Sequence, residues 1–456
     1  MIVMKFGGTS VESAAAIERA ARIVKAHLER RPVVVVSAMG KTTNRLLAAA
    51  TDAVHGRREQ SLAALESLRD YHLRETQPVI SEADWPEARR VIETHFQELV
   101  ELVRGLAVLG ELTPRSLDAI ASYGERLSSQ LVALAFRNFG MDTAHVDARC
   151  LILTDARHTQ ANPLFPETYA RLAEAIPPLA AEKVVVLGGF IGATEKGVTT
   201  TLGRGGSDFT ASIVGAGIGA EEIQIWTDVD GMLTCDPRIL PGGHRVKIIS
   251  FAEAAELAYF GAKVLHPSTV LPAVEKNIPV RILNSRRPEV EGTRIVAEPV
   301  RCDNVVKAIA CKRGITVVNV RSTRMLMAYG FLRRIFEVFD RCETPVDMVS
   351  TSEVSVSLTI DNNARLEEIC QELRGFSEVE VEENQAIVCL VGDNIRYTPG
   401  VAGRVFRAIE DINVRMISQG ASLLNLSFVV AEPDLVRTVE RLHAEFFSRL
   451  DPAVFD

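Results

Sequence analysis

The chain has 456 residues, which is enough for two to four domains of about 100–200 residues each. Hydrophobic residues make up 47% and charged residues 24%, the proportions of an ordinary soluble globular protein. The net charge of −8 excludes a general electrostatic attraction to nucleic acid or to an anionic membrane, so we expect neither as a partner.

The seven cysteines are spread along the chain without a Cys-x-x-Cys pair or a neighbouring pair of histidines. This spacing argues against a zinc site or a disulfide framework and favours a reducing, cytoplasmic location. The N-terminal stretch MIVMKFGG reaches its glycines too early for a signal peptide, so we expect none. No apolar run reaches the length of about 18 residues that a membrane-spanning helix requires.

Strands and helices alternate through the first two thirds of the chain. Nearly continuous apolar runs predict strands that are buried on both faces, at 2–6, 32–37, 183–190, 222–227 and 278–283. Helical periodicity lies between them, for example at 14–30 and 251–260, and residues 56–140 predict an inserted set of helices. This order predicts an α/β fold, a layered sandwich around a mostly parallel sheet.

The last third contains a duplication. Gly330 and Gly400 each begin a segment that reads amphipathic helix, apolar strand, turn and strand, with a period of about 70 residues. We therefore predict a first domain at 1–298 and two small modules at 299–383 and 384–456. A strand from about 304–311 would complete the second module.

Four loops follow predicted strands, and in a parallel sheet they would meet at one edge, where ligands bind. They are Gly7-Gly8, Ser37–Thr43, Gly188-Gly189 and Thr227-Asp228. Glycine pairs let backbone N–H groups approach phosphate oxygens. Lys5, Arg204, Asp208 and Lys263 lie beside the predicted strand ends or helix starts. Charges in such surroundings suit phosphoryl transfer, in which positioning and electrostatics do most of the chemistry.

Six ordered motifs together resemble aspartokinase. They are KFGGTS at 5–10, VVSAMGKTTN at 35–44, YGERLSS at 123–129, TTTLGRGGSD at 199–208, WTDVDGMLTCDPR at 226–238 and FGAKVLHP at 260–267. The resemblance covers almost the whole chain and implies an amino-acid-kinase-type three-layer αβα sandwich followed by paired ACT modules of βαββαβ order. It implies Mg²⁺-dependent transfer of the γ-phosphoryl group of ATP to the side-chain carboxylate of L-aspartate, the first step of lysine, threonine and methionine biosynthesis. No room is left before Asp456 for a fused homoserine dehydrogenase, so we expect a monofunctional enzyme.

Two alternatives stay open at this level. One is another amino-acid or carbamate kinase of the same fold. The other is a catalytically inactive protein that senses an amino acid through its tail.

The resemblance also assigns residues to the phosphate and substrate sites. Lys5 and Lys263 would contact the phosphates and act in catalysis, and Asp208 would orient Lys5 and reach the metal directly or through water. An isolated aspartate after a Gly-Ser turn is otherwise a helix N-cap, and Asp208 can fill both roles. The remaining nucleotide-binding residues would be Gly7, Gly8, Thr9, Thr227, Asp228, Leu233, Arg238 and Val264, although Leu233 stands where the family often has tyrosine.

Arg204 would hold the α-carboxylate of the substrate through its planar guanidinium, and Glu125 would pair with the ammonium. Without the resemblance, Glu125 reads as part of a solvated helix face. Ser37, Thr43 and Ser207 would complete the substrate site, and His266 is more typical of a capping or packing histidine.

The tail would bind an amino-acid effector, for which lysine is favoured over threonine by Asp347 and Glu353. Their alternative role is only to cap and solvate the module. The other effector-binding residues would be Met325, Ala328, Phe331, Leu332, Thr351 and Ser352, with Ala328 standing where some lysine-inhibited relatives have serine. Such modules pair between copies, so we expect at least a homodimer.

Overall fold

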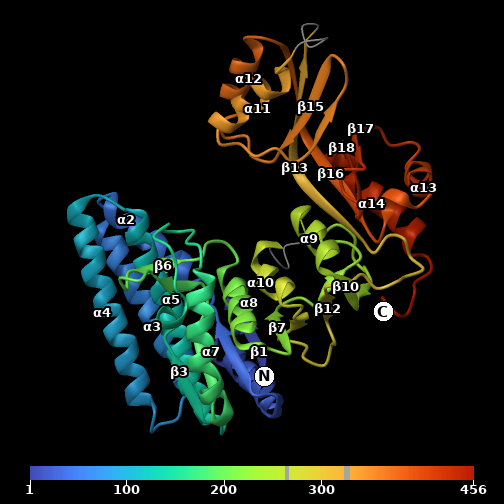
Figure 1. The fold of residues 1–456 in the computed structure, drawn as a ribbon. Coiled ribbons are helices and arrows are strands. Elements are labelled where there is room, and N and C mark those ends of the chain that lie inside the picture. The colour runs from blue at the N-terminus through green and yellow to red at the C-terminus, as the bar shows by residue number, and fades with distance from the viewer. Residues whose placement is uncertain (262–266, 323–328) are drawn as a thin grey trace. The chain divides into compact units, whose positions relative to one another are not determined.

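The computed structural model describes residues 1–261, 267–322 and 329–456, and the chain divides into two compact units (Figure 1). The first unit comprises Met1–Met232 and Val264–Glu298, and the second comprises Leu233–Lys263 and Pro299–Asp456. Among the described helices, none has the length and apolar character that crossing a membrane requires.

The first unit is built on a mostly parallel sheet. Its strands are β1 (Ile2–Phe6), β2 (Pro32–Val36), β3 (Thr143–Val146), β4 (Val184–Gly188), β7 (Glu222–Thr227), β11 (Val280–Asn284) and β12 (Thr293–Val296). They are ordered β12-β11-β7-β1-β2-β4-β3. Neighbours are parallel except for β12, which runs antiparallel to β11. The short hairpin of β5 (Ile191–Ala193) and β6 (Thr199–Thr201) lies outside this sheet. The two-residue strand β8 (Met232–Leu233) follows β7 in the chain.

Helices cover the sheet on both faces. They are α1 (Ala14–Lys25), α2 (Thr42–Val54), α3 (Arg58–Thr76), α4 (Trp85–Leu109), α5 (Pro114–Asn138), α6 (Ala148–Leu151), α7 (Phe165–Glu182), α8 (Gly206–Ile218) and α10 (Leu271–Glu275), with 3-10 turns η1 (Gly8–Ser10), η2 (Leu28–Arg30), η3 (Gln77–Val79) and η4 (Pro267–Val270). Met4 and Phe6 of β1 pack into the core with α1–α5. Side chains alternate along a strand, so Val3 and Lys5 face the other side, where α8 contacts β1, β2 and β7.

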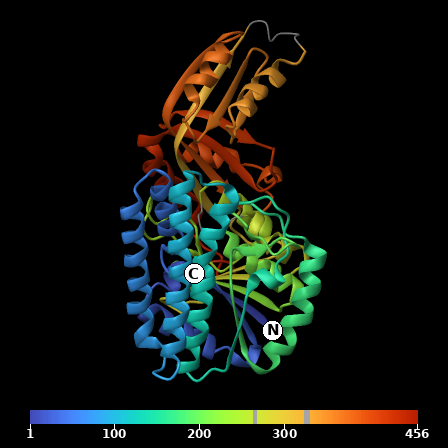
Figure 2. The same ribbon diagram turned by 90° about the vertical axis from the view of Figure 1, so that its left-hand side faces the viewer.

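These observations confirm the predicted fold class and all five predicted strands. The predicted helical insertion at 56–140 corresponds to α3, α4 and α5, which run side by side with α2 in the blue to cyan part of Figure 2. The helix expected over 14–30 ends earlier, at Lys25, and continues as a separate 3-10 turn.

The second unit contains an antiparallel sheet ordered β14-β15-β13-β16-β18-β17. Its strands are β13 (Ala308–Arg321), β14 (Val349–Thr351), β15 (Ser355–Ile360), β16 (Glu378–Val391), β17 (Val414–Gln419) and β18 (Asn425–Ala431). The short strands β9 (Arg245–Val246) and β10 (Ile248–Ser250) lie outside this sheet. The helices are α9 (Phe251–Tyr259), α11 (Phe331–Arg341), α12 (Leu366–Arg374), α13 (Val401–Ala408) and α14 (Leu435–Phe447), with turns η6 (Ile395–Tyr397) and η7 (Glu432–Asp434).

The predicted duplication is present in this unit. Gly330 and Gly400 precede α11 and α13 with left-handed φ angles of 79° and 85°, and each helix is followed by two strands. The long strand β13 begins at Ala308 and pairs with β16 over its whole length, so that it contributes to the sheet of both modules.

The predicted first domain, 1–298, differs from the observed units at Leu233–Lys263. This segment belongs to the second unit, and it makes several specific contacts with the tail. Thr234 Oγ1 bonds to His443 Nε2 at 2.9 Å, and Cys235 forms a β-bridge with Ile309. The ammonium of Lys307 lies 2.8 Å from the carboxylate of Glu253, and both side chains are fully buried.

Candidate functional site

A cavity of about 510 Å³ opens in the first unit, where β1, β2 and β4 end. This volume suits a small-molecule ligand. The cavity is lined by the described residues that we predicted as catalytic or substrate-binding: Lys5, Ser37, Thr43, Glu125, Arg204, Ser207 and Asp208. Side chains from four separate motifs of the sequence therefore meet around one space.

Lys5 and Asp208 form an ion pair on one wall of this cavity. The Lys5 Nζ lies 2.6 Å from Asp208 Oδ1, and the two side chains are 10% and 16% exposed. The alternative that Asp208 caps its helix is wrong, because α8 begins at Gly206 and its N-cap is Gly205. Asp208 instead lies in the first turn of α8, which leaves its carboxylate directed at Lys5.

Glu125 is buried in α5 and only 4% exposed, so the alternative of a solvated helix face is wrong. Its Oε1 accepts a hydrogen bond from the backbone N–H of Ala38 at 3.2 Å. Burial raises the pKa of Glu125 to about 8, although the hydrogen bond from Ala38 acts in the opposite direction. The buried carboxyl group is therefore suited to receive a cation that restores its charge.

The adjacent glycine explains how the 37–43 loop reaches Glu125. A Cβ atom at Gly124 would lie 2.7 Å from the Cβ of Ala38 and 2.9 Å from Thr43 Oγ1, closer than real side chains approach. Ser128, one turn later in α5, donates its hydroxyl to the carbonyl of Ser37 at 2.9 Å. Helix α5 thus fixes the loop that carries Ser37 and Thr43.

Arg204 is exposed and lines the cavity from the loop between β6 and α8. Its neighbours Gly203 and Gly205 have φ angles of 76° and 71°, a left-handed conformation that glycine adopts without strain. None of the ion pairs among the described residues involves Arg204. Its guanidinium is therefore presented to the cavity with its donors available for a ligand.

The predicted phosphate-binding loop after β1 requires one correction. The N–H of Gly7 donates to the carbonyl of Trp226 at 3.1 Å, so it is not available to a phosphate. Gly8 and Thr9 open the 3-10 turn η1, and the first N–H groups of a helix lack partners within it. These two residues, rather than Gly7, can donate to an anion.

The other described residues that we predicted to bind the nucleotide are not part of the cavity lining. Thr227 ends β7 and Asp228 follows it, and the carbonyl of Thr227 accepts from the N–H of Ser285 at 2.8 Å. Leu233 and Arg238 belong to the second unit, where Arg238 pairs with Asp236 at 2.6 Å. Lys263, Val264 and His266 lie outside the described residues.

The predicted effector residues belong to the first module of the tail. Phe331 is 7% exposed and packs edge-on against Phe376, so only its backbone can meet a ligand. It is the first residue of α11, where N–H groups are free to bind a carboxylate. Leu332 is exposed, as are three residues at and after the end of β14: Thr351, Ser352 and Glu353. Met325 and Ala328 lie outside the described residues.

Asp347 already has a cation as its partner, which the sequence analysis missed. Its side chain is 7% exposed, and its carboxylate oxygens accept from Lys312 Nζ at 2.9 and 2.8 Å. The same ammonium lies 2.8 Å from Asp361, and the Tyr259 hydroxyl donates to Asp347 at 3.4 Å. Asp347 is therefore paired within its own unit and is little exposed to solvent.

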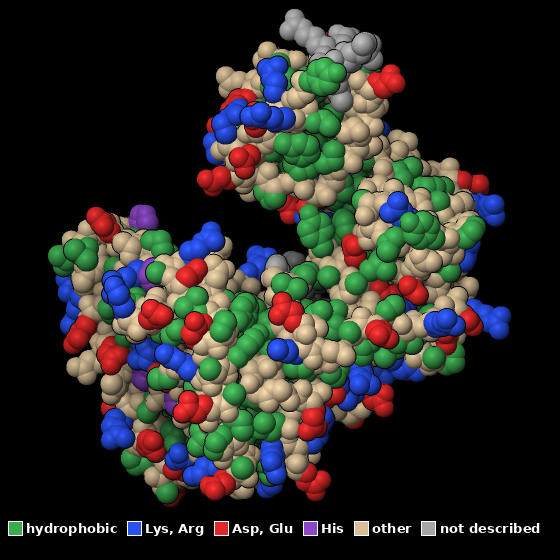
Figure 3. All heavy atoms as spheres, viewed as in Figure 1, with side chains coloured by type: hydrophobic (Ala, Val, Ile, Leu, Met, Phe, Trp, Pro, Cys, Tyr) green, Lys and Arg blue, Asp and Glu red, His purple; other side chains and the backbone are tan. Residues whose placement is uncertain are grey.

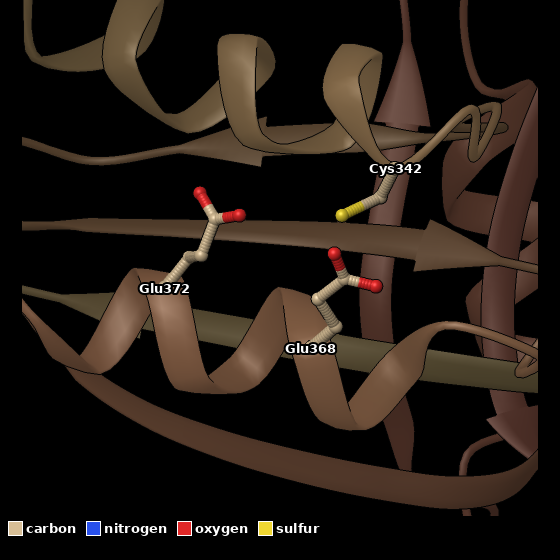
Figure 4. Close-up of side chains that lie close together, drawn as sticks. All are labelled: Cys342, Glu368 and Glu372. Atoms are coloured by element: carbon tan, nitrogen blue, oxygen red, sulfur yellow. The ribbon is translucent and has the colours of Figure 1, made fainter.

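One cluster has the composition of a metal site. Cys342 Sγ and carboxylate oxygens of Glu368 and Glu372 lie within 4.8 Å of one another between α11 and α12 (Figure 4). However, Glu372 is paired with Arg341, and Glu368 is paired with Arg365 at 2.6 Å. Figure 3 accordingly shows acidic and basic side chains interspersed over these helices. The Arg341–Glu372 pair links α11 to α12, whereas Arg365 and Glu368 pair at the start of α12 itself. Both carboxylates are thus engaged in ion pairs, and the cluster is structural.

Sequence analysis also missed Asp118, which lines the cavity from α5 and is 1% exposed. It precedes Glu125 by two helical turns on the same helix face, and this spacing is the signal that could have identified it. Its partners Thr159 and Thr201 line the cavity as well.

Comparison with known proteins agrees with this geometry. The profile described as "Amino acid kinase family" matches residues 1–284, and an "ACT domain" profile matches residues 388–446. "Aspartokinase 1, chloroplastic" of Arabidopsis thaliana is 38% identical, over 98% of this chain and 80% of that protein.

Two solved structures of E. coli aspartokinase III are also similar, each at 36% identity. The complex with lysine and aspartate has a TM-score of 0.84 and covers 98% of this chain and 99% of that chain. The complex with aspartate and ADP has a TM-score of 0.82 and covers 98% and 100%. These matches confirm the predicted family, and the chain is a member of the aspartokinase family.

Proposed function

We propose that this chain transfers the γ-phosphoryl group of ATP to the side-chain carboxylate of L-aspartate, giving 4-phospho-L-aspartate and ADP. The observation that carries the proposal is the presence of Glu125, Arg204 and the Lys5–Asp208 pair around a single cavity. These groups offer, in order, an acceptor for an ammonium, a forked donor for a carboxylate, and a cation for phosphate oxygens. The E. coli structures that contain aspartate, or aspartate with ADP, support the same assignment.

Arg204 would hold the α-carboxylate of aspartate and Glu125 its ammonium, with Ser37, Thr43 and Ser207 donating hydrogen bonds around the substrate. The side-chain carboxylate then remains free to attack. An aspartate carboxyl group, with a pKa of about 3.9, is already ionised at neutral pH, so the reaction needs no general base. An oxygen–phosphorus bond forms to the γ-phosphorus, and the bond from that phosphorus to the β–γ bridging oxygen breaks, which releases ADP.

The main barrier is the approach of two anions, and it is lowered by positive charge. Lys5 would contact the phosphates, and its bond to Asp208 would hold the ammonium in place. Gly8 and Thr9 would add backbone N–H groups. Lys263, Thr227, Asp228, Leu233, Arg238 and Val264 stay assigned to the nucleotide by resemblance alone.

Asp208 is the carboxylate that fits a role toward Mg²⁺. It lines the cavity, yet one of its oxygens is bonded to Lys5. A single carboxylate of this kind suits Mg²⁺, which keeps several waters and is held largely by the phosphates of a nucleotide. When bound, the ion would offset charge on the phosphate oxygens.

The tail would make the enzyme sensitive to lysine. The N-terminus of α11 would bind the effector carboxylate, and Asp347 and Glu353 would bind its side-chain ammonium. Lys312 must then leave Asp347, or share it, when lysine binds. We further propose domains at 1–298, 299–383 and 384–456, a homodimer formed through the two modules, and a cytoplasmic location. The proposed location rests on the spacing of the seven cysteines in the sequence.

Hydroxylamine trapping of the acyl phosphate tests the activity. The full chain is incubated with ATP and Mg²⁺ and with aspartate, glutamate or N-acetylglutamate, and hydroxamate formation is measured. We expect hydroxamate with aspartate alone. Product with another acceptor would support a different kinase of this fold. No product above a blank without enzyme would refute the kinase assignment and favour an inactive sensor.

A further inference from the structure

Asp118 is a buried carboxylate in the wall of the cavity, and its hydrogen bonds are made to two other segments of the chain. Its Oδ1 accepts from Thr201 Oγ1 at 2.5 Å and from the N–H of Thr159 at 3.0 Å. Its Oδ2 accepts from His158 Nδ1 at 2.7 Å and from the same N–H at 3.1 Å. Both oxygens are therefore occupied by protein donors, and Asp118 is poorly suited to bind the substrate itself.

The partners of Asp118 hold the turn that carries Arg204. Thr159 has a φ angle of 72°, a left-handed conformation that is unfavourable for a β-branched residue and requires support from its surroundings. A Cβ atom on Gly203 would lie 3.3 Å from the carbonyl oxygen of Thr159, so these two left-handed positions pack directly together. In addition, the N–H of Ala161 donates to the carbonyl of Thr201 at 2.9 Å.

Thr201 ends β6, and Gly203 precedes Arg204 in the sequence. Asp118 thus binds both segments on which the backbone of Arg204 depends: the 158–161 loop through a side chain and an N–H, and the end of β6 through a hydroxyl. No other described carboxylate accepts hydrogen bonds from both segments.

Helix α5 connects this anchor to the other end of the substrate site. Asp118 and Glu125 are separated by two turns, about 10 Å along the helix, and lie on the same face. Between them, Ile120 packs into the hydrophobic core of the unit and Ala121 lines the cavity. One rigid element therefore carries Glu125 directly and positions Arg204 through Asp118.

We propose that Asp118 is a positioning residue that sets the separation between Arg204 and Glu125, and thereby selects substrates that carry an ammonium and a carboxylate on the same carbon. The proposal rests on the roles assigned to these two residues under the proposed function. It adds a residue that contacts neither substrate nor nucleotide, yet determines how well the α-amino-acid group is recognised.

Two variants test this role. Asp118→Asn keeps the shape of the side chain but loses the charge and one acceptor, and Thr201→Val removes one donor to Asp118. Each should raise the KM for aspartate between about 10- and 100-fold, the range expected when a binding group is displaced by about 1 Å. The KM for ATP should stay within about twofold, and kcat should fall much less than the KM for aspartate rises.

A matched control separates positioning from a general loss of stability. Ser129→Ala removes a buried hydroxyl from the same helix, one that bonds to His145 at 3.0 Å and does not line the cavity. This variant should lower the melting temperature without changing the KM for aspartate.

A double-mutant cycle with Arg204→Ala gives the decisive result. If Asp118 acts through Arg204, then Asp118→Asn should produce little further rise in KM once Arg204 has been removed. An equal rise in both backgrounds would overturn the proposal, as would an Asp118→Asn enzyme whose KM for aspartate is unchanged. Calorimetric titration of L-aspartate into each variant repeats the comparison without turnover. A failure of the kinase assignment would appear as absent hydroxamate in the unmodified protein, and is thereby distinguished from a failure of this inference.

Discussion

Replacing Glu125 by glutamine should remove a pH dependence that the structure builds into aspartate binding. Burial raises the pKa of Glu125 to about 8, so the free enzyme carries this group mostly protonated at neutral pH. The group must ionise to pair with the substrate ammonium. Each pH unit below 8 lowers the ionised fraction about tenfold, so kcat/KM for aspartate should rise about tenfold from pH 6 to pH 7 and level off above pH 8.

Glutamine keeps an oxygen that can accept from the N–H of Ala38, but it has no charge. The Glu125→Gln enzyme should therefore lose the acidic limb of the pH profile, which is the rise in kcat/KM for aspartate below pH 8. At pH 8 it should also lose a charge-assisted interaction of about 1.5–3 kcal/mol, which is roughly a 10- to 150-fold lower kcat/KM for aspartate.

The assay is initial velocity against aspartate at saturating ATP and Mg²⁺, between about pH 6 and pH 8.5, with kcat/KM for ATP measured alongside as an internal reference. Glu98→Gln is the matched control. Glu98 accepts a hydrogen bond at 2.7 Å from Tyr123, which lies on the same helix as Glu125, but Glu98 does not line the cavity. It should keep the acidic limb. Persistence of that limb in Glu125→Gln, or a flat profile in the unmodified enzyme, would refute the reasoning.

Four further variants have defined outcomes. Arg204→Ala should raise the KM for aspartate roughly 10- to 150-fold with little change for ATP, and equal effects on both substrates would contradict its assignment. Lys5→Ala should mainly lower kcat in steady-state assays, because the charge it faces grows in the transition state; an effect on KM alone would oppose this. Lys312→Met frees Asp347 and should lower the lysine concentration for half-inhibition about tenfold. A higher concentration would exclude competition between the ammonium of Lys312 and that of the lysine effector for Asp347. Lys307→Met leaves a fully buried carboxylate unpaired and should cost about 3–5 kcal/mol in urea-induced unfolding of the second unit, and an unchanged midpoint would count against this.

The local pattern of the sequence determined the elements and the family. The strands at 2–6 and 32–36 could be predicted because both of their faces are buried and every residue is apolar or, for Lys5, lies at the functional edge. The glycine-rich loops and the repeated tail could be predicted for a similar reason, since turn chemistry and duplication are properties of contiguous residues. The residues that line the cavity followed from the motifs that contain them.

Only the tertiary structure determined which charged side chains are buried and which groups from distant segments bind them. Glu125 lies in a helix whose sequence allows a solvated face, and its burial depends on the 37–43 loop packing over Gly124. The pairing of Asp347 with Lys312 joins a loop to a strand of the same module. Asp118 has no motif of its own, and its role depends on donors that lie 40 or more residues away in the chain. Burial and hydrogen bonding of this kind depend on which surfaces meet after folding, and that information is absent from the neighbouring residues.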